Sequence, residues 1–246
     1  MKEIHVLNGD SLLHHLPPSI SGEKIVFREC LVYGPVTSHS FEELVQVRQP
    51  FLDSVFPGSD YQRVVVPELE KLTIIPSESE VSCWFEEDLF CQVNFWCSIA
   101  LISKITQNIK LVLPRTNLEY GFAGLEERGL LQAKEAALSL TRDQIQLLSR
   151  LWDLFAHAKT KEALALAQSQ KEDLPFLLPA VQAWVDSTPR EGEMGLPKRF
   201  LSKLMKNPEI DSFGKAFRTF HHQLPIYGYG DAIVKILWNE LKDEGY

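Results

Sequence analysis

The segment 81–103 constrains the fold of this chain more than any other part of the sequence. It runs VSCWFEEDLFCQVNFWCSIALIS: a short apolar run, three consecutive acids (Glu86, Glu87 and Asp88) and a longer apolar run. The longer run has room for about four helical turns, so the pattern predicts a buried strand, an acidic turn and a buried helix. In open α/β sheets ligands bind at the carboxyl ends of the strands, where these acids lie.

Three further apolar runs have the length and composition of β-strands. They cover residues 3–7, 24–27 and 108–114, and with residues 80–85 they provide four strands. Because segments with helical spacing separate them, we expect parallel pairing with right-handed crossovers. The expected fold class is α/β, with a mainly parallel four-stranded sheet, flanking helices and the strand order 2-1-3-4.

Two helical segments precede the acidic stretch. Residues 41–55 carry apolar side chains at near-helical spacing, but Pro50 inside the segment predicts a kink or two shorter helices. Residues 66–72 also have helical spacing, although 64–66 fit a strand as well. We expect a helix there, because a proline follows Val66 and suits the first turn of a helix.

The second half of the chain has a different character. After residue 125 every convincing element is helical, and proline and glycine turns separate the segments. The expected helices cover residues 141–158, 161–168, 176–185, 197–206, 211–222 and 231–243. We therefore expect two domains, an α/β sheet domain at 1–125 and an all-helical domain at 126–246.

Charge and composition argue against several classes of protein. Residues 1–120 contain 9 Lys and Arg against 16 Asp and Glu, and residues 121–246 contain the remaining 16 against 17. Neither half has the basic excess that neutralises a phosphate backbone, so nucleic acid is a poor candidate partner. No apolar run reaches the length of a membrane span, and the start lacks the pattern of a signal peptide. We expect a cytoplasmic protein with no membrane partner, and the sequence does not indicate an oligomeric state.

Four motifs resemble a bacterial family catalogued as a domain of unknown function, number eighteen thirty-five. They are IHVLNGDSL at 4–12, FRECL at 27–31, WFEEDLFCQVN at 84–94 and IYGYGD at 226–231. The motifs occur in this order over most of the chain. The resemblance implies a sheet domain followed by a helical region, and it implies no activity and no catalytic residue.

Polar residues follow the predicted strands at the edge where parallel strands end. Carboxylates there suit Mg²⁺, because hard cations prefer oxygen ligands, and arginine suits a phosphate group. The candidate catalytic or metal-binding residues are Asp10, Glu29, Glu86 and Asp88. The candidate ligand-binding residues are Asn8, Gly9, Ser11, Arg28, Gln92 and Arg115.

Each of these residues also has a structural interpretation. Asp10 and Asp88 are well placed to cap helices, Glu29 to pair with an arginine, and Glu87 to face solvent. Gln92 lies one helical turn beyond Asp88 on the same face, so its amide suits either a ligand or a neighbouring loop. Asp10 and Asp88 could each cap a helix and also belong to the ligand site.

The sequence supports two functional hypotheses. In the first, the protein binds a small anionic or nucleotide-like ligand at the carboxyl ends of the strands and performs metal-assisted hydrolysis or group transfer, with Mg²⁺ as the candidate cofactor. In the second, it is a non-catalytic protein whose helical half contacts a protein or a nucleic acid. The acidic residues alone do not separate these hypotheses.

Overall fold

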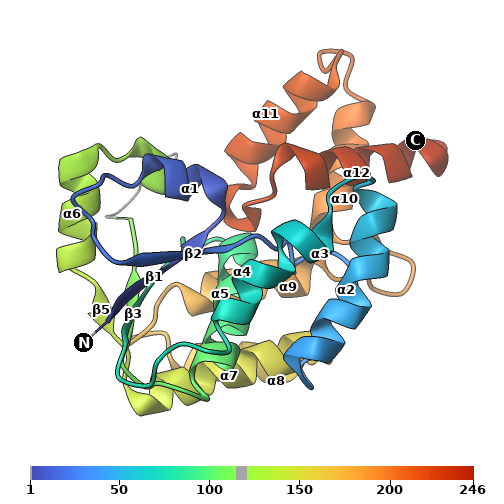
Figure 1. Ribbon diagram of the computed structural model, residues 1–246. Coiled ribbons are helices and arrows are strands. Elements are labelled where there is room, and N and C mark those ends of the chain that lie inside the picture. The colour runs from blue at the N-terminus through green and yellow to red at the C-terminus, as the bar shows by residue number, and fades with distance from the viewer. Residues whose placement is uncertain (1, 115–120) are drawn as a thin grey trace. The chain divides into compact units, whose positions relative to one another are not determined.

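The fold is built on one five-stranded sheet, seen in a computed structural model that describes residues 2–114 and 121–246 (Figure 1). The strands are β1 (Glu3–Asn8), β2 (Glu23–Phe27), β3 (Glu80–Trp84), β4 (Ile109–Val112) and β5 (Leu138–Ser139). Their order is β2-β1-β3-β4-β5. The first four strands pair in parallel and β5 pairs antiparallel with β4. The predicted α/β class, the mainly parallel sheet and the order of its first four strands are confirmed.

The chain divides into two compact units. The first contains residues 1–86 and 91–159, and the second contains residues 87–90 and 160–246. In this division the helices that follow residue 125, as far as residue 159, belong to the same unit as the sheet. The reason is that β5, whose two residues are too few for a strand pattern in the sequence, pairs with β4 and draws the neighbouring helices to the sheet.

The first unit contains most of the helices that surround the sheet. They are α1 (Asp10–His15), α2 (Phe41–Val55), α3 (Tyr61–Val64), α4 (Val66–Lys71), α5 (Leu89–Ile102), the 3₁₀ helix η1 (Gly121–Gly124), α6 (Glu127–Glu135) and α7 (Arg142–Ala156). The helix predicted after residue 66 is confirmed as α4, with a proline in its first turn. Helix α2 is a single helix that contains Pro50, and it is not divided into two.

The two faces of the sheet are covered by different helices. Leu7 of β1 and Trp84 of β3 pack with side chains of α1 and α6 in one apolar cluster. Helix α5 lies on the other side of the strands from α1 (Figure 1). Nearly all of its residues are buried, which explains why its sequence is apolar all round and not amphipathic.

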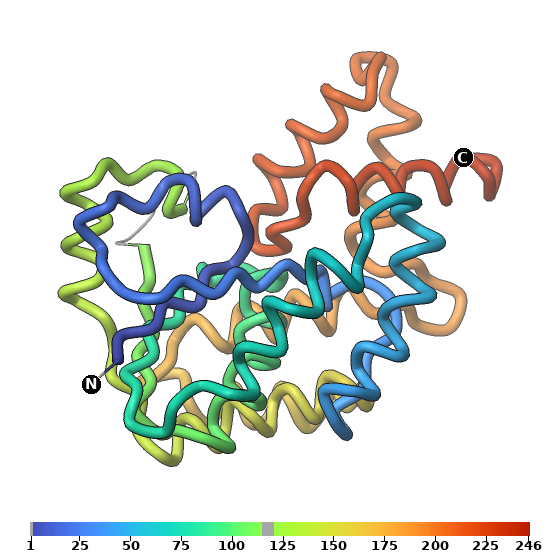
Figure 2. The backbone as a smooth tube through the Cα atoms, in the orientation of Figure 1, coloured from blue at the N-terminus to red at the C-terminus, as the bar shows by residue number. Residues whose placement is uncertain are grey.

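The strand order defines a topological switch point between β1 and β3. From β1 the chain crosses by α1 to β2 on one side, and from β3 it crosses by α5 to β4 on the other side. Figure 2 follows the chain from the N-terminus along β1 into α1. Because the two crossovers diverge there, the carboxyl ends of β1 and β3 mark the usual position of a ligand in sheets of this kind.

The second unit consists largely of helices. They are α8 (Thr160–Ser169), α9 (Leu177–Ser187), α10 (Leu196–Met205), α11 (Phe213–Gln223), the 3₁₀ helix η2 (Pro225–Tyr227) and α12 (Asp231–Asp243). Apolar side chains such as Val181, Leu201 and Val234 are fully buried, as the core of a helical region requires. None of the helices in the described parts of the chain has the length and apolar character needed to cross a membrane.

Candidate functional site

Asp10 lies just beyond β1 and pairs with Arg28, which follows β2. The Arg28 Nε is 2.9 Å from both carboxylate oxygens of Asp10, and Nη2 is 2.7 Å from Oδ1. These hydrogen bonds lower the pKa of Asp10. Gly9, with φ of 92°, occupies the capping position of α1, so Asp10 falls in the first turn of the helix. The prediction that Asp10 caps a helix is wrong, because no side chain among the described residues caps α1.

The guanidinium of Arg28 is therefore occupied. It was expected to hold an anionic ligand, but two of its nitrogens bind Asp10 and Nη1 lies 3.4 Å from the carbonyl oxygen of Val64. Its side chain is 22% exposed, against 48% for Asp10. An anion at this position would have to share Arg28 with Asp10.

Glu29 is buried and participates in an ion pair beneath the sheet edge. Its side chain and that of Arg48 are both 0% exposed, and Arg48 Nη2 lies 2.9 Å from Glu29 Oε2. The Tyr61 hydroxyl donates to Oε1 at 2.6 Å. The polar groups of Glu29, Arg48 and Tyr61 are thus hydrogen-bonded to one another. This favours a structural role for Glu29 over a role in contact with a ligand.

A chain of amide groups connects the ends of β1 and β2 to α5. Asn94 Nδ2 donates to the Glu29 carbonyl at 2.7 Å and to Asn8 Oδ1 at 2.9 Å. Asn94 Oδ1 accepts from the Leu31 backbone N–H at 3.3 Å. Asn8 Nδ2 in turn donates to the Cys91 Sγ at 3.0 Å. This buried network places a sulfur atom beside the end of β1.

Glu86 follows β3 and is held by η1. Its Oε1 accepts a hydrogen bond from the Phe122 backbone N–H at 2.9 Å. Gly121 has φ of 52°, and a Cβ added there would lie 2.2 Å from the Glu86 carboxyl. Only glycine leaves room for the carboxylate at this point, so η1 forms a cradle for Glu86.

Asp88 has a corresponding glycine within the second unit. A Cβ added at Gly228, whose φ is 62°, would lie 1.8 Å from Asp88 Oδ1. Gly228 belongs to the IYGYGD motif at 226–231. Two features therefore favour glycine at position 228: its backbone is left-handed, and the Asp88 carboxylate leaves no room for a Cβ.

Gln92 extends from α5 back toward the start of the helix. Its Nε2 donates to the carbonyl oxygen of Glu86 at 2.8 Å, and the side chain is 0% exposed. Its Oε1 is buried and has no hydrogen-bond partner within the described part of the chain. Buried amide oxygens usually have a hydrogen-bond partner in native structures, so this oxygen is a candidate for contact with a ligand or ion.

Three metal-binding side chains converge in this segment. One ligand atom from each of Glu86, Asp88 and Cys91 lies within 4.8 Å of the others. All three belong to six consecutive residues, so the turn from β3 into α5 sets their spacing. Cys91 was not among the predicted site residues, although its position three residues after Asp88 places it on the same face of a helix.

The remaining predicted residues are less informative. Ser11 is exposed in the first turn of α1. Arg115 lies outside the described residues.

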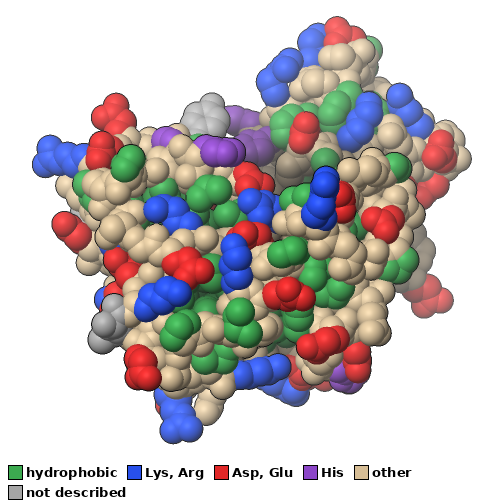
Figure 3. Space-filling model, in the orientation of Figure 1, with side chains coloured by type: hydrophobic (Ala, Val, Ile, Leu, Met, Phe, Trp, Pro, Cys, Tyr) green, Lys and Arg blue, Asp and Glu red, His purple; other side chains and the backbone are tan. Residues whose placement is uncertain are grey.

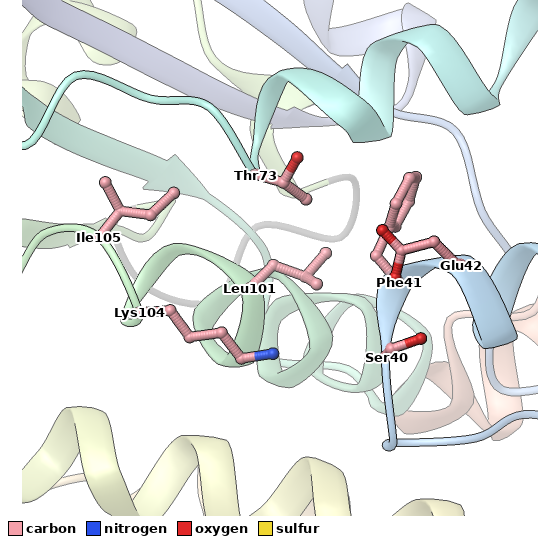
Figure 4. Close-up of a pocket in the computed structure, with 7 residues that line it drawn as sticks. All are labelled: Ser40, Phe41, Glu42, Thr73, Leu101, Lys104 and Ile105. Carbon is pink, nitrogen blue, oxygen red and sulfur yellow. The ribbon is translucent and has the colours of Figure 1, made fainter.

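A separate hollow of about 200 Å³ lies at the opposite end of α5 and involves none of the predicted site residues (Figure 4). Its lining residues are Ser40, Phe41, Glu42, Thr73, Leu101, Lys104 and Ile105.

Comparison with known proteins provides no relative from which a function could be transferred. No protein-family model, curated protein or solved structure matches this chain. The resemblance to the domain-of-unknown-function family therefore stays a prediction.

Proposed function

We propose that this protein binds a small anionic or nucleotide-like ligand at the switch point between β1 and β3. A divalent cation held by Glu86 and Asp88 then supports hydrolysis or group transfer on that ligand. The observation that carries the proposal is the strand order β2-β1-β3-β4-β5, which puts the switch point between Asn8 and Glu86.

Local charge makes the cation central to this proposal. Residues 86–88 are three consecutive acids, and Arg28, the nearby cation expected to bind an anion, is paired with Asp10. Three neighbouring acidic side chains disfavour the approach of an anionic ligand. A divalent cation neutralises two carboxylates and attracts the ligand's phosphate or carboxylate oxygens, so binding of the anion should depend on the cation.

The molecular surface does not suggest nucleic acid as a strong alternative. On the face shown in Figure 3, acidic and basic side chains are interspersed. The formal net charge of the chain is −8. Small phosphate-bearing molecules are therefore the better first probes of the site.

Thermal-shift measurements on the whole chain test the proposal. The probes are ADP, ATP and inorganic phosphate, each with and without Mg²⁺, Mn²⁺ or Zn²⁺. A ligand at one hundred times its Kd stabilises the folded state by about 2.7 kcal/mol, which for a chain of this size corresponds to roughly 5–10 °C. We expect such a shift only when a cation and an anion are both present. If no combination changes the melting temperature, the non-catalytic interaction hypothesis is favoured instead.

A further inference from the structure

We propose that Cys91 is a metal ligand, and that Glu86, Asp88, Cys91 and the Oε1 of Gln92 together form a site for Zn²⁺ or a similar borderline cation. This inference rests on the proposed function and refines it, because the sequence alone suggested Mg²⁺. Three separate observations support it: the converging donors, the unpartnered oxygen of Gln92 and the hydrogen bond to the sulfur.

The first observation is the kind of donors that converge. Two carboxylates and a thiol lie within 4.8 Å of one another, which is a spacing compatible with ligands that share one metal ion at bond distances of about 2.0–2.3 Å. Mg²⁺ takes oxygen ligands and is poorly served by sulfur. Thiolate ligands favour Zn²⁺ and related late transition metals, so the presence of Cys91 changes the expected metal.

The second observation is the orientation of Gln92. Its Nε2 must face the Glu86 carbonyl, because that carbonyl can only accept a hydrogen bond. The opposite end of the amide, Oε1, is then buried without a partner among the described residues. Because the side chain reaches back to Glu86, the amide lies in the same turn as the three donors. A metal ion there would supply the interaction that Oε1 lacks.

The third observation is that the amide network makes the sulfur an acceptor. The Leu31 N–H can only donate and the Glu29 carbonyl can only accept, and together they fix the orientation of the Asn94 amide. The remaining proton of Asn94 Nδ2 goes to Asn8 Oδ1. Asn8 must therefore present its N–H to the Cys91 Sγ, at 3.0 Å.

An N–H donor aimed at sulfur stabilises the thiolate form, which is the form that binds metal. Supporting hydrogen bonds of this kind orient ligands and increase metal affinity. Asn8 and Asn94 are therefore positioning residues in this proposal. They also explain why polar side chains are present in an otherwise apolar part of the protein.

Titration of the whole chain with Co²⁺ tests the inference directly, because Co²⁺ replaces Zn²⁺ and reports a bound thiolate through a charge-transfer absorption band. We expect the band to appear on titration and to disappear when Zn²⁺ is added. Competition between the two metals then gives the Zn²⁺ affinity, and far-ultraviolet circular dichroism checks the folding of every variant.

Two variants and one control identify the ligand. Cys91→Ser should abolish the band and weaken Zn²⁺ binding by more than the roughly 10–100-fold expected for losing a supporting hydrogen bond. Asn8→Leu removes the donor to sulfur at a similar side-chain size without adding a charge, and it should keep the band but lower the Zn²⁺ affinity by about 10–100-fold. Cys30→Ser changes a half-buried thiol that is not among the converging donors and should have no effect.

The results distinguish this inference from the proposed function. If Co²⁺ gives no thiolate band, or if folded Cys91→Ser retains it, the assignment of Cys91 is overturned. If Mg²⁺ still supports binding of ADP or phosphate in that case, the proposed function stands without the thiolate site. If Co²⁺ gives the band and yet no anionic probe binds with any cation, the metal site stands and the proposed function fails.

Discussion

His5 shows how a single buried residue links stability to pH. Its Nδ1 accepts a hydrogen bond from the Trp84 indole at 3.1 Å, and its Nε2 lies 2.8 Å from the Ser21 carbonyl. The ring must therefore be neutral, with its proton on Nε2. Burial lowers the pKa of His5 from 6.5, although the nearby Glu3 opposes this effect and the Lys134 and Lys24 side chains reinforce it. His5 is therefore a hydrogen-bonded histidine of the core.

We predict that the folded state loses stability as the pH falls below about 6.5. There the unfolded chain takes up a proton on His5 before the folded chain does, so the free energy of unfolding falls by at most about 1.4 kcal/mol per pH unit for this residue. Above pH 6.5 the contribution is constant. Urea unfolding between about pH 5 and 8 measures the slope, and His5→Gln should reduce it. An unchanged slope in that variant would contradict the assignment.

The buried pair of Glu29 and Arg48 should contribute mainly to stability. We predict that Glu29→Gln destabilises the first unit by about 3–5 kcal/mol, because it leaves the Arg48 charge buried and uncompensated. Asp10→Asn is the matched control, since it removes a partly exposed ion pair and should cost no more than about 1 kcal/mol. Urea unfolding gives both values. Equal losses in the two variants would show that the burial argument for Glu29 is wrong.

At the scale of elements, the junction between β3 and α5 depends on glycines that hold its carboxylates. We predict that Gly121→Ala displaces Glu86 and weakens divalent-metal binding, because the new Cβ would lie 2.2 Å from the carboxyl. Gly58→Ala is the control, because Gly58 has φ of 87° but no described neighbour within 4 Å of an added Cβ. Both variants should carry a backbone cost of about 1–2 kcal/mol, and only Gly121→Ala should lose metal affinity.

The same comparison applies to Asp88. Gly228→Ala would place a Cβ 1.8 Å from Asp88 Oδ1, whereas Gly192, with φ of 75°, has open space among the described residues. We predict weaker metal binding for Gly228→Ala and unchanged binding for Gly192→Ala, measured by the Zn²⁺ and Co²⁺ competition. Equal affinities in the two variants would show that the position of Asp88 does not matter for the metal.

The elements were more predictable than the contacts between them. The strand, acidic turn and helix at 81–103 follow from local hydrophobic pattern, and they are present as β3 and α5. The pairing of Asp10 with Arg28 and the cradle around Glu86 depend on residues that are distant in sequence. No local pattern encodes such contacts, which explains why Asp10 was expected to cap a helix. Cys91, in contrast, lies within six residues of Glu86, so the local sequence could have identified it.

At the scale of the whole molecule, the sheet brings the predicted residues to one edge but does not make them equivalent. Asn8 is the last residue of β1, and Asp10, Arg28, Glu29 and Glu86 follow parallel strands, as expected from the strand order. Burial then separates them: Glu29 is enclosed, whereas Glu86 is half-buried. The sequence could predict which residues lie at the edge, because parallel strands end together, but not their exposure, which depends on packing from α2, α3 and η1.

The central claim is that Glu86 binds a cation on which ligand binding at the switch point depends. Calorimetric titration of the whole chain with ADP, with and without Zn²⁺ or Mg²⁺, tests it most directly. Glu86→Gln removes the candidate ligand, and Glu87→Gln changes its exposed neighbour. We predict cation-dependent binding that is lost in Glu86→Gln and retained in Glu87→Gln. Binding of ADP without a cation, or equal binding in the two variants, would contradict the claim.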